Sequence, residues 1–235
     1  MEPAGLTTTP IVALDFTDPG AALEMVERLG GRCRFYKVGS ELFTAAGPGF
    51  VRELRERGCR VFLDLKFHDI PNTVGRAAAA ASALGASILT VHATGGEQMI
   101  RTAVANAGDR CGVFAVTVLT SFDAPQLGAV WGREVADPDM AWEVTRLADL
   151  ALRSGARGVV CSGHEAGALR THFGDALQLL VPGVRLPGSA TDDQARTVTP
   201  REAATAGASY VILGRTVTSA SDPAAAMDEA VASLG

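Results

Sequence analysis

Short runs of apolar and β-branched residues recur along the whole chain and alternate with amphipathic or alanine-rich segments. The segments at 48–58, 73–85 and 140–155 have helical periodicity and end in a glycine, which suits a helix C-cap. Strands that alternate with helices predict a parallel sheet, and eight such units in 235 residues fit a closed (β/α)8 TIM barrel of the α/β class. The predicted strands cover residues 11–16, 35–39, 60–67, 87–93, 112–119, 158–163, 177–183 and 210–215.

An open, doubly wound sheet is the alternative architecture for this pattern. No G-x-G-x-x-G sequence opens the first unit, and the Gly-Pro-Gly at 47–49 lacks a third glycine and precedes a helix. No linker rich in proline or serine divides the chain. We therefore predict a single barrel domain over residues 1–235, with its active site at the C-terminal ends of the strands.

Two connections in this barrel are unusually long. Residues 120–139 and 184–200 read as polar or glycine- and proline-rich loops. Long loops in a compact barrel are often lids or ligand clamps, so both are candidates for contact with a ligand.

Charged residues occur at positions of the third strand that face the barrel interior. Side chains alternate along a strand, so Val61, Leu63 and Leu65 share the apolar face that packs under the helices. Asp64 and Lys66 therefore point inward near the end of the strand where barrel active sites lie.

The first two strands repeat this pattern. Ile11, Ala13 and Asp15 share the inward face of the first strand, and Lys37 shares the inward face of the second strand with Phe35. A single charge at a strand end is usually a solvated rim residue, but four inward charges on adjacent strands are not explained in that way. Because buried charges are costly unless paired, the cluster favours a catalytic role.

Asp69 lies five residues after Asp64, and its role has two interpretations. It is either a turn or N-cap residue before Pro71, or the last member of an array of alternating charge, Lys37–Asp64–Lys66–Asp69. Glycines after the seventh and eighth strands, with Arg185 and the pair Gly214-Arg215, indicate a phosphate site.

Composition narrows the class of partner. The chain has 21 Lys and Arg against 26 Asp and Glu, a net charge of −5, which argues against nonspecific binding to nucleic acid. We expect a cytoplasmic protein with no membrane contact, since the sequence shows no signal-peptide pattern and no apolar run as long as a membrane span. The four cysteines form no C-x-x-C pair, and we predict that they are buried, reduced thiols. We do not interpret the four histidines as metal ligands. Trp131 and Trp142 are expected to pack the fifth connection.

The segment Asp64–Thr73, with the sequence DLKFHDIPNT, resembles the signature of the orotidine 5′-phosphate decarboxylase family. The resemblance extends over almost the whole chain and includes residues 13–15, 36–39, 117–121, 182–185, 193–194 and 214–215. The D-x-K-x-x-D core is shared with sister barrels that act on sugar phosphates, whereas the extension at 67–73 is much more specific.

This resemblance implies a decarboxylase that makes uridine 5′-phosphate (UMP) and CO2 in the last step of pyrimidine synthesis. It implies a reaction without metal or cofactor in a homodimer, in which Asp69 and Thr73 reach into the partner's site. Lys66 would be the proton donor, Asp64 would face the substrate carboxylate, and Lys37 would anchor Asp64. By the same resemblance the catalytic residues are Lys37, Asp64, Lys66 and Asp69, and the substrate-binding residues are Asp15, Lys37, Asp64, Thr73, Thr120, Ser121, Arg185, Gln194, Gly214 and Arg215.

Two other functions remain open for such a sequence. One is a magnesium-dependent lyase that acts on sugar phosphates, in which the acidic groups at the strand ends hold the metal. The other is a phosphate-binding barrel that senses a metabolite without turnover, which would not need two lysines inside the barrel.

Overall fold

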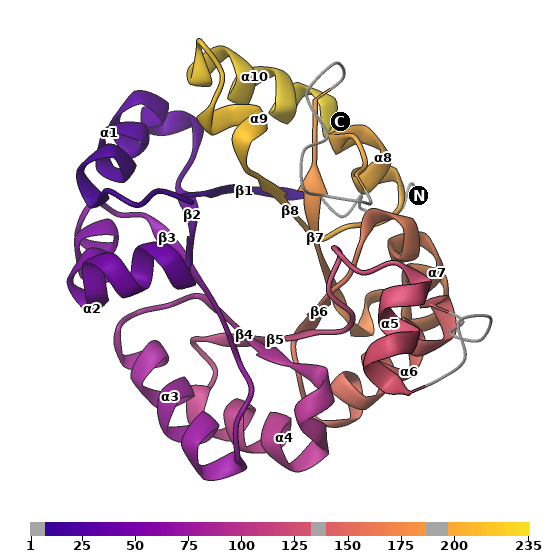
Figure 1. The fold of residues 1–235 in the computed structure, drawn as a ribbon. Coiled ribbons are helices and arrows are strands. Elements are labelled where there is room, and N and C mark those ends of the chain that lie inside the picture. The colour runs from indigo at the N-terminus through magenta and orange to yellow at the C-terminus, as the bar shows by residue number, and fades with distance from the viewer. Residues whose placement is uncertain (1–7, 133–139, 187–196) are drawn as a thin grey trace, which may run out of the picture.

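Eight parallel strands close into a barrel in the computed structural model, which describes residues 8–132, 140–186 and 197–235 (Figure 1). Each strand pairs with the next in the chain, and the last pairs with the first. The predicted (β/α)8 barrel is therefore confirmed. The strands are β1 (Thr9–Ala13), β2 (Phe35–Gly39), β3 (Arg60–Phe67), β4 (Ile88–His92), β5 (Gly112–Val116), β6 (Gly158–Val160), β7 (Gln178–Val184) and β8 (Tyr210–Leu213).

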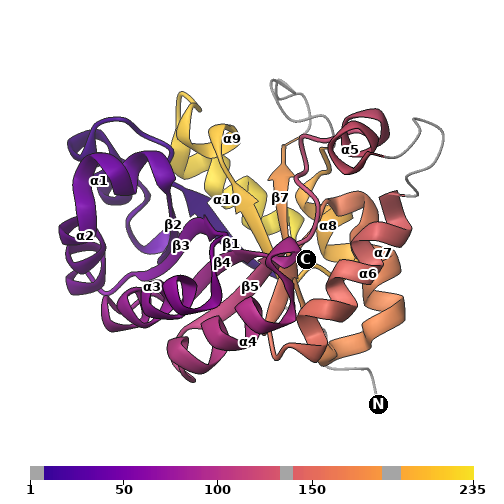
Figure 2. The same ribbon diagram turned by 60° about the horizontal axis from the view of Figure 1, so that its bottom comes forward.

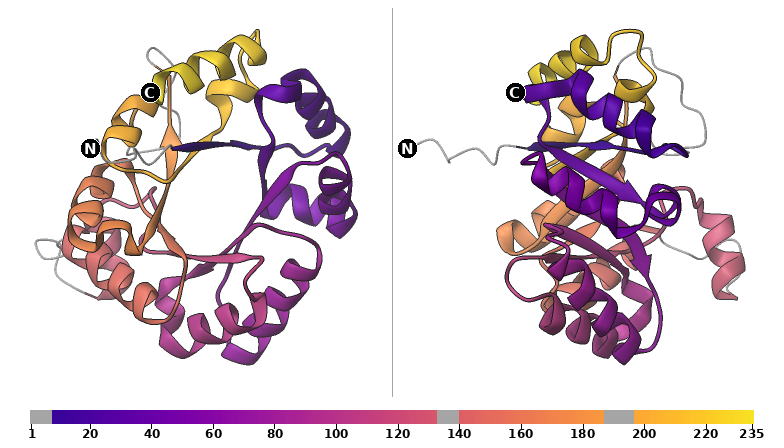
Figure 3. Two further views of the ribbon diagram at one scale, coloured as in Figure 1. Left: turned by 180° about the vertical axis from the view of Figure 1, so that it is seen from behind. Right: turned by 90° about the vertical axis from the view of Figure 1, so that its left-hand side faces the viewer.

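The helices surround this ring of strands, as the view from behind also shows (Figure 3). The predicted glycine caps at 58, 85 and 155 all have positive φ, at 74°, 86° and 83°. The helices are α1 (Pro19–Leu29), α2 (Ser40–Glu56), α3 (Pro71–Ala83), α4 (Gly96–Ala107), α5 (Ala124–Trp131), α6 (Met140–Arg153), α7 (Gly163–Phe173), α8 (Pro200–Thr205), α9 (Arg215–Thr218) and α10 (Pro223–Ser233), with short 3₁₀ turns η1 (Gly30–Arg32), η2 (Ala93–Gly95) and η3 (Gly174–Ala176).

Two separate apolar cores follow from the alternation of side chains along the strands. The larger lies between strands and helices and contains Val61 and Leu63, with Leu65 packed against it. The smaller fills the barrel interior and contains Ile11 and Phe62 among its members. The predicted assignment of inward and outward faces is thus confirmed.

Aromatic rings close the end of the barrel where the strands begin. The Tyr210 ring lies edge-on to Phe35 and Phe114, with centroids 6.1 and 5.8 Å apart. The Arg60 guanidinium stacks over Phe35, 4.1 Å from its centroid. Because this end of the barrel interior is filled, the space inside the barrel opens toward the C-terminal ends of the strands.

Several predicted strands extended too far at their C-terminal ends. β1 ends at Ala13 and β5 at Val116, so Asp15 and residues 117–119 lie in loops; β6 and β8 also end earlier than predicted. The apolar run misleads here because residues beyond the ladder, such as Val118, are still buried. An apolar pattern indicates which residues are buried, but it does not indicate which of them pair with a neighbouring strand.

The prediction that 120–139 is a loop was wrong in part, because it contains α5. Asp123 caps this helix and forms a capping box with Gln126, a signal that was present in the sequence. In the side view α5 stands out from the barrel on the side where the strands end (Figure 3, right). Residues 133–139 lie outside the described part of the chain.

The two tryptophans of this connection differ from each other. Trp131 packs against the outer core as expected, whereas Trp142 is 51% exposed, so its predicted packing role was wrong. The Arg146 guanidinium lies 5.8 Å from each ring centroid and is also paired with the buried Glu143. Trp142 is therefore held by a cation–π contact with Arg146 and not by burial in the core.

All four cysteines are buried and outside any disulfide, as expected. Burial raises the pKa of the Cys33 thiol, and it raises the pKa of Cys111 to about 11. Within the described part of the chain, no helix has the length and apolar character needed to cross a membrane.

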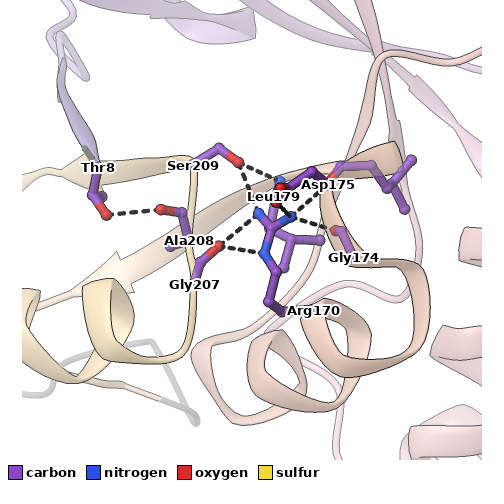
Figure 4. A network of polar contacts seen from close by, with 9 residues as sticks. Thr8, Arg170, Gly174, Asp175, Leu179, Gly207, Ala208 and Ser209 are labelled. Atoms are coloured by element: carbon purple, nitrogen blue, oxygen red, sulfur yellow. Dashed lines mark hydrogen bonds and ion pairs between the residues drawn. The ribbon is translucent and has the colours of Figure 1, made fainter. Parts of the chain in front are cut away.

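A polar network fastens the face where the strands begin (Figure 4). The Arg170 side chain of α7 reaches the connections that precede β7 and β8, and Thr8 adds a hydrogen bond of 2.8 Å from its hydroxyl to the Ala208 carbonyl. Ser209 Oγ also accepts the N–H of Leu179 at 3.1 Å. The Arg170 guanidinium donates to the carbonyls of Gly174, Leu177 and Gly207 and to the side chains of Asp175 and Ser209.

Replacing Arg170 tests whether this face supports stability. We expect Arg170→Ala to lower the free energy of unfolding by about 2–4 kcal/mol, because several carbonyls lose a charged donor. Arg153→Ala is the matched control, since Arg153 makes an exposed ion pair with Asp149 and should change stability by less than about 1 kcal/mol. Urea denaturation measures both. A loss of stability no larger than that of Arg153→Ala would contradict the role of this network.

Candidate active site

A cavity of about 490 Å³ opens at the C-terminal ends of the strands. β7 points toward this side of the barrel, where α5 also lies (Figure 2). The upper members of the inner core, including Phe62 and Ile212, form its apolar floor. The predicted site residues that line it are Asp15, Lys37, Asp64, Lys66, Thr120, Ser121, Arg185, Gly214 and Arg215.

A chain of alternating charges lies on one side of this cavity. Lys37 Nζ is 2.7 Å from Asp15 Oδ1 and 3.8 Å from Asp64 Oδ2. Lys66 Nζ is 2.8 Å from the same Asp64 oxygen. The side chains of Lys37 and Asp64 are 11% and 13% exposed, whereas those of Lys66 and Asp15 are 38% and 60% exposed. The array therefore runs from a buried centre to two ends that a ligand can reach.

Asp64 is ionised at neutral pH despite its burial. Burial alone would raise its pKa, but the ammonium groups of Lys37 and Lys66 and hydrogen bonds from Lys66 and Thr90 outweigh this effect. The pKa of Asp64 therefore lies below its ordinary value. The site presents a fixed carboxylate beside a fixed ammonium group, an arrangement suited to stabilising charge that develops during a reaction.

Gly39 allows the array to form. It pairs with Asp64 across β2 and β3, next to the ion pair of Lys37 and Asp15. A Cβ at this position would lie 3.1 Å from Lys37 Nζ and 3.3 Å from Asp15 Oδ1, which would crowd both groups. Glycine therefore leaves room for the ion pair, since a larger residue would displace one or both of these groups by a few tenths of an ångström.

β3 is irregular where it carries the two central charges. Its register against β4 shifts between Leu63 and Phe67, and Lys66 has φ of 48°. Alternation predicted the inward direction of Lys66, but a bulge sets its position rather than a regular strand. A non-glycine residue in the left-handed region is strained, by about 1–2 kcal/mol, and such strain is common at functional sites.

Sequence reasoning missed Thr90 on β4. This fully buried residue donates its hydroxyl to Asp64 Oδ1 at 2.9 Å and accepts the N–H of Lys66 at 3.0 Å. The available signal was a hydroxyl at an inward-facing position of an apolar strand, between Ile88 and His92.

Hydrogen bonds from backbone N–H groups hold the first of the segments predicted to bind phosphate, and one of them joins it to the second segment. Arg185 N donates to the Val198 carbonyl at 2.9 Å, and Leu186 N donates to Thr216 Oγ1 at 3.0 Å, just after Gly214-Arg215. Arg185 and Arg215 both line the cavity, so two cations face the space, one from the residue just after β7 and one from α9. Gln194, also predicted for this subsite, lies outside the described residues.

Asp69 and Thr73 are not brought into the cavity of their own chain. Both are exposed, and the Asp69 carboxylate accepts the N–H of Ile70 at 2.6 Å. Within the described ranges, Asp69 makes no ion pair with Lys66, so the array in one subunit ends at Lys66. Ile70 between them is 66% exposed, an unusual position for a large apolar side chain.

The described residues of the site do not form a set of metal ligands. In the described part of the chain, no three His, Cys, Asp or Glu side chains are grouped as metal ligands would be. The two aspartates of the array share the Lys37 ammonium group between them.

Comparison with known proteins gives matches over nearly the whole chain. The model of the orotidine 5′-phosphate decarboxylase / HUMPS family matches residues 8–230. The chain is 48% identical over 229 residues to orotidine 5′-phosphate decarboxylase of Photobacterium profundum, covering 95% of this chain and 97% of the relative. It is 50% identical over 222 residues to the protein of that name in Anaeromyxobacter dehalogenans, covering 94% and 96%.

A solved structure shows the same similarity. The crystal structure of orotidine 5′-phosphate decarboxylase from Lactobacillus acidophilus superposes with a TM-score of 0.85 at 36% identity, covering 97% of this chain and 99% of that one. Fold and sequence therefore agree on one group of relatives.

The lowered pKa of Asp64 predicts a pH dependence of stability. Ionised Asp64 contributes fully above the ordinary carboxyl pKa of about 3.9, and the contribution is lost as pH falls through its lower folded-state pKa. We expect wild type to be more stable than Asp64→Asn at pH 7, with an advantage that shrinks below about pH 4. Urea denaturation of both proteins at about five pH values between pH 2 and pH 7 measures this difference. An advantage that stays constant across the series would show that the pKa of Asp64 is not lowered.

Proposed function

The chain belongs to the orotidine 5′-phosphate decarboxylase / HUMPS family, and we infer that it converts orotidine 5′-phosphate to UMP and CO2 in the last step of de novo pyrimidine biosynthesis. The enzyme is a carboxy-lyase. The observation that carries this inference is the buried Asp64 carboxylate, bonded to Lys66 and close to Lys37, beside a cavity that Arg185 and Arg215 also line. Such a site suits a substrate that bears both a carboxylate and a phosphate.

The substrate is bound in three parts. Asp15 and Lys37 hold the ribose hydroxyls, and Thr120 and Ser121 contact the edge of the pyrimidine from the connection that leads to α5. Arg185, Gly214, Arg215 and Gln194 bind the phosphate. Support comes from the lining of the cavity, which contains all of these residues except Gln194. Binding energy from the phosphate, remote from the reacting carbon, is then available to stabilise the transition state.

The reaction breaks the bond between C6 of the pyrimidine and the carboxylate carbon. The electron pair stays on C6 as a poorly delocalised vinylic carbanion, and CO2 leaves. Asp64, ionised and close to the substrate carboxylate, disfavours the bound substrate, and this repulsion disappears as CO2 departs. The Lys66 ammonium group stabilises the growing negative charge and then transfers its proton to C6.

Lys37 helps to keep these groups in place. It contacts the same Asp64 oxygen as Lys66, and its bond to Asp15 fixes its direction. Fixed charges need little reorganisation during the reaction, and this accounts for catalysis by side chains alone. The proposal assigns no metal or cofactor to any step.

The functional unit is a homodimer in which Asp69 and Thr73 complete the partner's site. Three exposed features on one short segment support this: the Asp69 carboxylate, Thr73 and the large apolar Ile70 side chain. A partner surface that covers Ile70 would bring Asp69 close to a second Lys66 and extend the charge array across the interface.

We place the enzyme in the cytoplasm as a single barrel domain that binds neither nucleic acid nor membrane. The four free thiols support a reducing compartment. The net charge of −5 supports the absence of nucleic-acid binding, and the local cations of the cavity serve the anionic substrate.

One assay tests the function and its proton donor together. We expect the protein to decarboxylate orotidine 5′-phosphate in excess EDTA, followed by the loss of ultraviolet absorbance of the substrate. Lys66→Ala should abolish turnover, because the other lysine of the array, Lys37, is held between Asp15 and Asp64, yet the variant should still bind UMP.

Each failure of this assay has a distinct meaning. Activity that requires magnesium would favour a metal-dependent lyase of sugar phosphates. Binding of UMP without turnover in wild type would favour a metabolite sensor. Comparable turnover in Lys66→Ala would remove Lys66 from its role.

Hybrid dimers test the shared site. Asp69→Ala and Lys66→Ala are each expected to be nearly inactive alone, whereas a mixed dimer contains one site with both native residues. An equimolar mixture should recover about a quarter of wild-type activity, since half of the dimers are mixed and one of their two sites is intact. Absence of recovery, with subunit exchange shown by mass spectrometry of differently tagged chains, would argue against a site built from two subunits.

A further inference from the structure

The bulge in β3 has a single residue of β4 opposite it. Leu63 pairs with Leu89 and Phe67 pairs with Val91. Three residues of β3, at 64–66, therefore lie opposite one residue of β4, Thr90. These three include Asp64 and Lys66, so the irregular part of the strand is also the part that carries the reaction.

Thr90 bonds to both ends of this bulge. Its hydroxyl donates to Asp64 Oδ1 at 2.9 Å, while its oxygen accepts the backbone N–H of Lys66 at 3.0 Å. An ionised carboxylate only accepts and a backbone N–H only donates, so a group between them must do both. A hydroxyl meets this condition, whereas the similarly sized side chain of valine does not.

The bond to Lys66 N compensates for a lost ladder bond. Because the register shifts, this N–H meets a side chain rather than a carbonyl of β4. A buried N–H without a partner is costly, and Lys66 is already strained at φ of 48°. Thr90 therefore holds the backbone from which the proposed proton donor extends.

Simple packing does not account for Thr90. The residue is completely buried on an apolar strand, and a buried hydroxyl is unfavourable unless it is bonded. Valine would fill the same volume without that cost. The hydroxyl is thus explained by its two bonds, both of which lead to the charge array.

We propose that Thr90 is a positioning residue for the decarboxylation, which fixes the Asp64 carboxylate and the Lys66 backbone relative to each other through one hydroxyl group. The inference rests on the proposed function. Thr90 does not line the cavity, so it acts on the substrate only through Asp64 and Lys66.

The test compares Thr90→Val with Thr90→Ser. Thr90→Val removes both bonds, and its kcat for orotidine 5′-phosphate should fall roughly ten- to hundredfold, the range expected for one hydrogen bond to a charged group. The affinity for UMP should change by less than about threefold, because the ribose and phosphate contacts remain. Thr90→Ser keeps the hydroxyl and should restore kcat to within about threefold of wild type.

A pH profile separates positioning from a loss of stability. The hydrogen bond from Thr90 helps to lower the pKa of Asp64, so the acidic limb of kcat/KM should move to higher pH in Thr90→Val and not in Thr90→Ser. The other charged groups that face Asp64, namely Lys37, Lys66 and His92, are unchanged in both variants, and so is the titration of the substrate phosphate.

Thr117→Val is the matched control. Thr117 is also buried, but its hydroxyl donates to the Val160 carbonyl at 2.9 Å and does not contact the array. Its loss should lower the free energy of unfolding and leave the acidic limb in place. If Thr90→Val does not fold, Thr90→Ala removes the same hydroxyl without placing a methyl group against the carboxylate.

The outcomes distinguish this inference from the proposed function. A wild type that does not decarboxylate orotidine 5′-phosphate overturns the function itself. An active wild type together with a folded Thr90→Val of equal kcat and unchanged acidic limb overturns the role of Thr90. A folded Thr90→Ser as impaired as Thr90→Val also overturns it, because the methyl group would then be the part that matters.

Discussion

A carboxylate removed from water must be held by cations. This requirement determines how side chains are arranged at the C-terminal ends of the barrel strands. Asp64 lies between Lys37 and Lys66, and Lys37 in turn contacts Asp15. Such groups contribute little net stability, because desolvation offsets most of their attraction. Their positions depend on neighbours that lack a side chain or supply a hydroxyl, namely Gly39 and Thr90. The reaction explains an arrangement that stability alone would not favour.

The two ends of the barrel divide these tasks between them. Where the strands begin, aromatic rings packed edge-on and the Arg170 network hold the elements together without enclosing a ligand. Where the strands end, the apolar core stops at the floor of a cavity, and charged groups replace it. A rigid base allows the opposite end to keep strained backbone and buried charge, as in other barrel enzymes. Lys66, at φ of 48°, is the clearest case of such strain.

The eight alternating strand and helix segments predicted the barrel, and the two-residue period of a strand predicted its inward and outward faces and the inward charges. This pattern did not predict where the strands end or that α5 interrupts a connection, since burial continues beyond the ladder. Thr90 was missed because its importance depends on a register shift between neighbouring strands, which no single strand records. The roles proposed for Asp69 and Thr73 would involve a second chain, and so they rest on the resemblance.

Because its thiols are buried, the chain reacts slowly with reagents that attack sulfur. A thiolate is the reactive form, and burial both shields the four sulfur atoms and raises the pKa of Cys33 and Cys111. A cysteine introduced at the surface would therefore be the principal site of alkylation under mild conditions, with all native cysteines left in place. Spectroscopic probes can then be attached singly, for instance beside Ile70, so that distances between the subunits of the proposed dimer can be measured on an otherwise native protein.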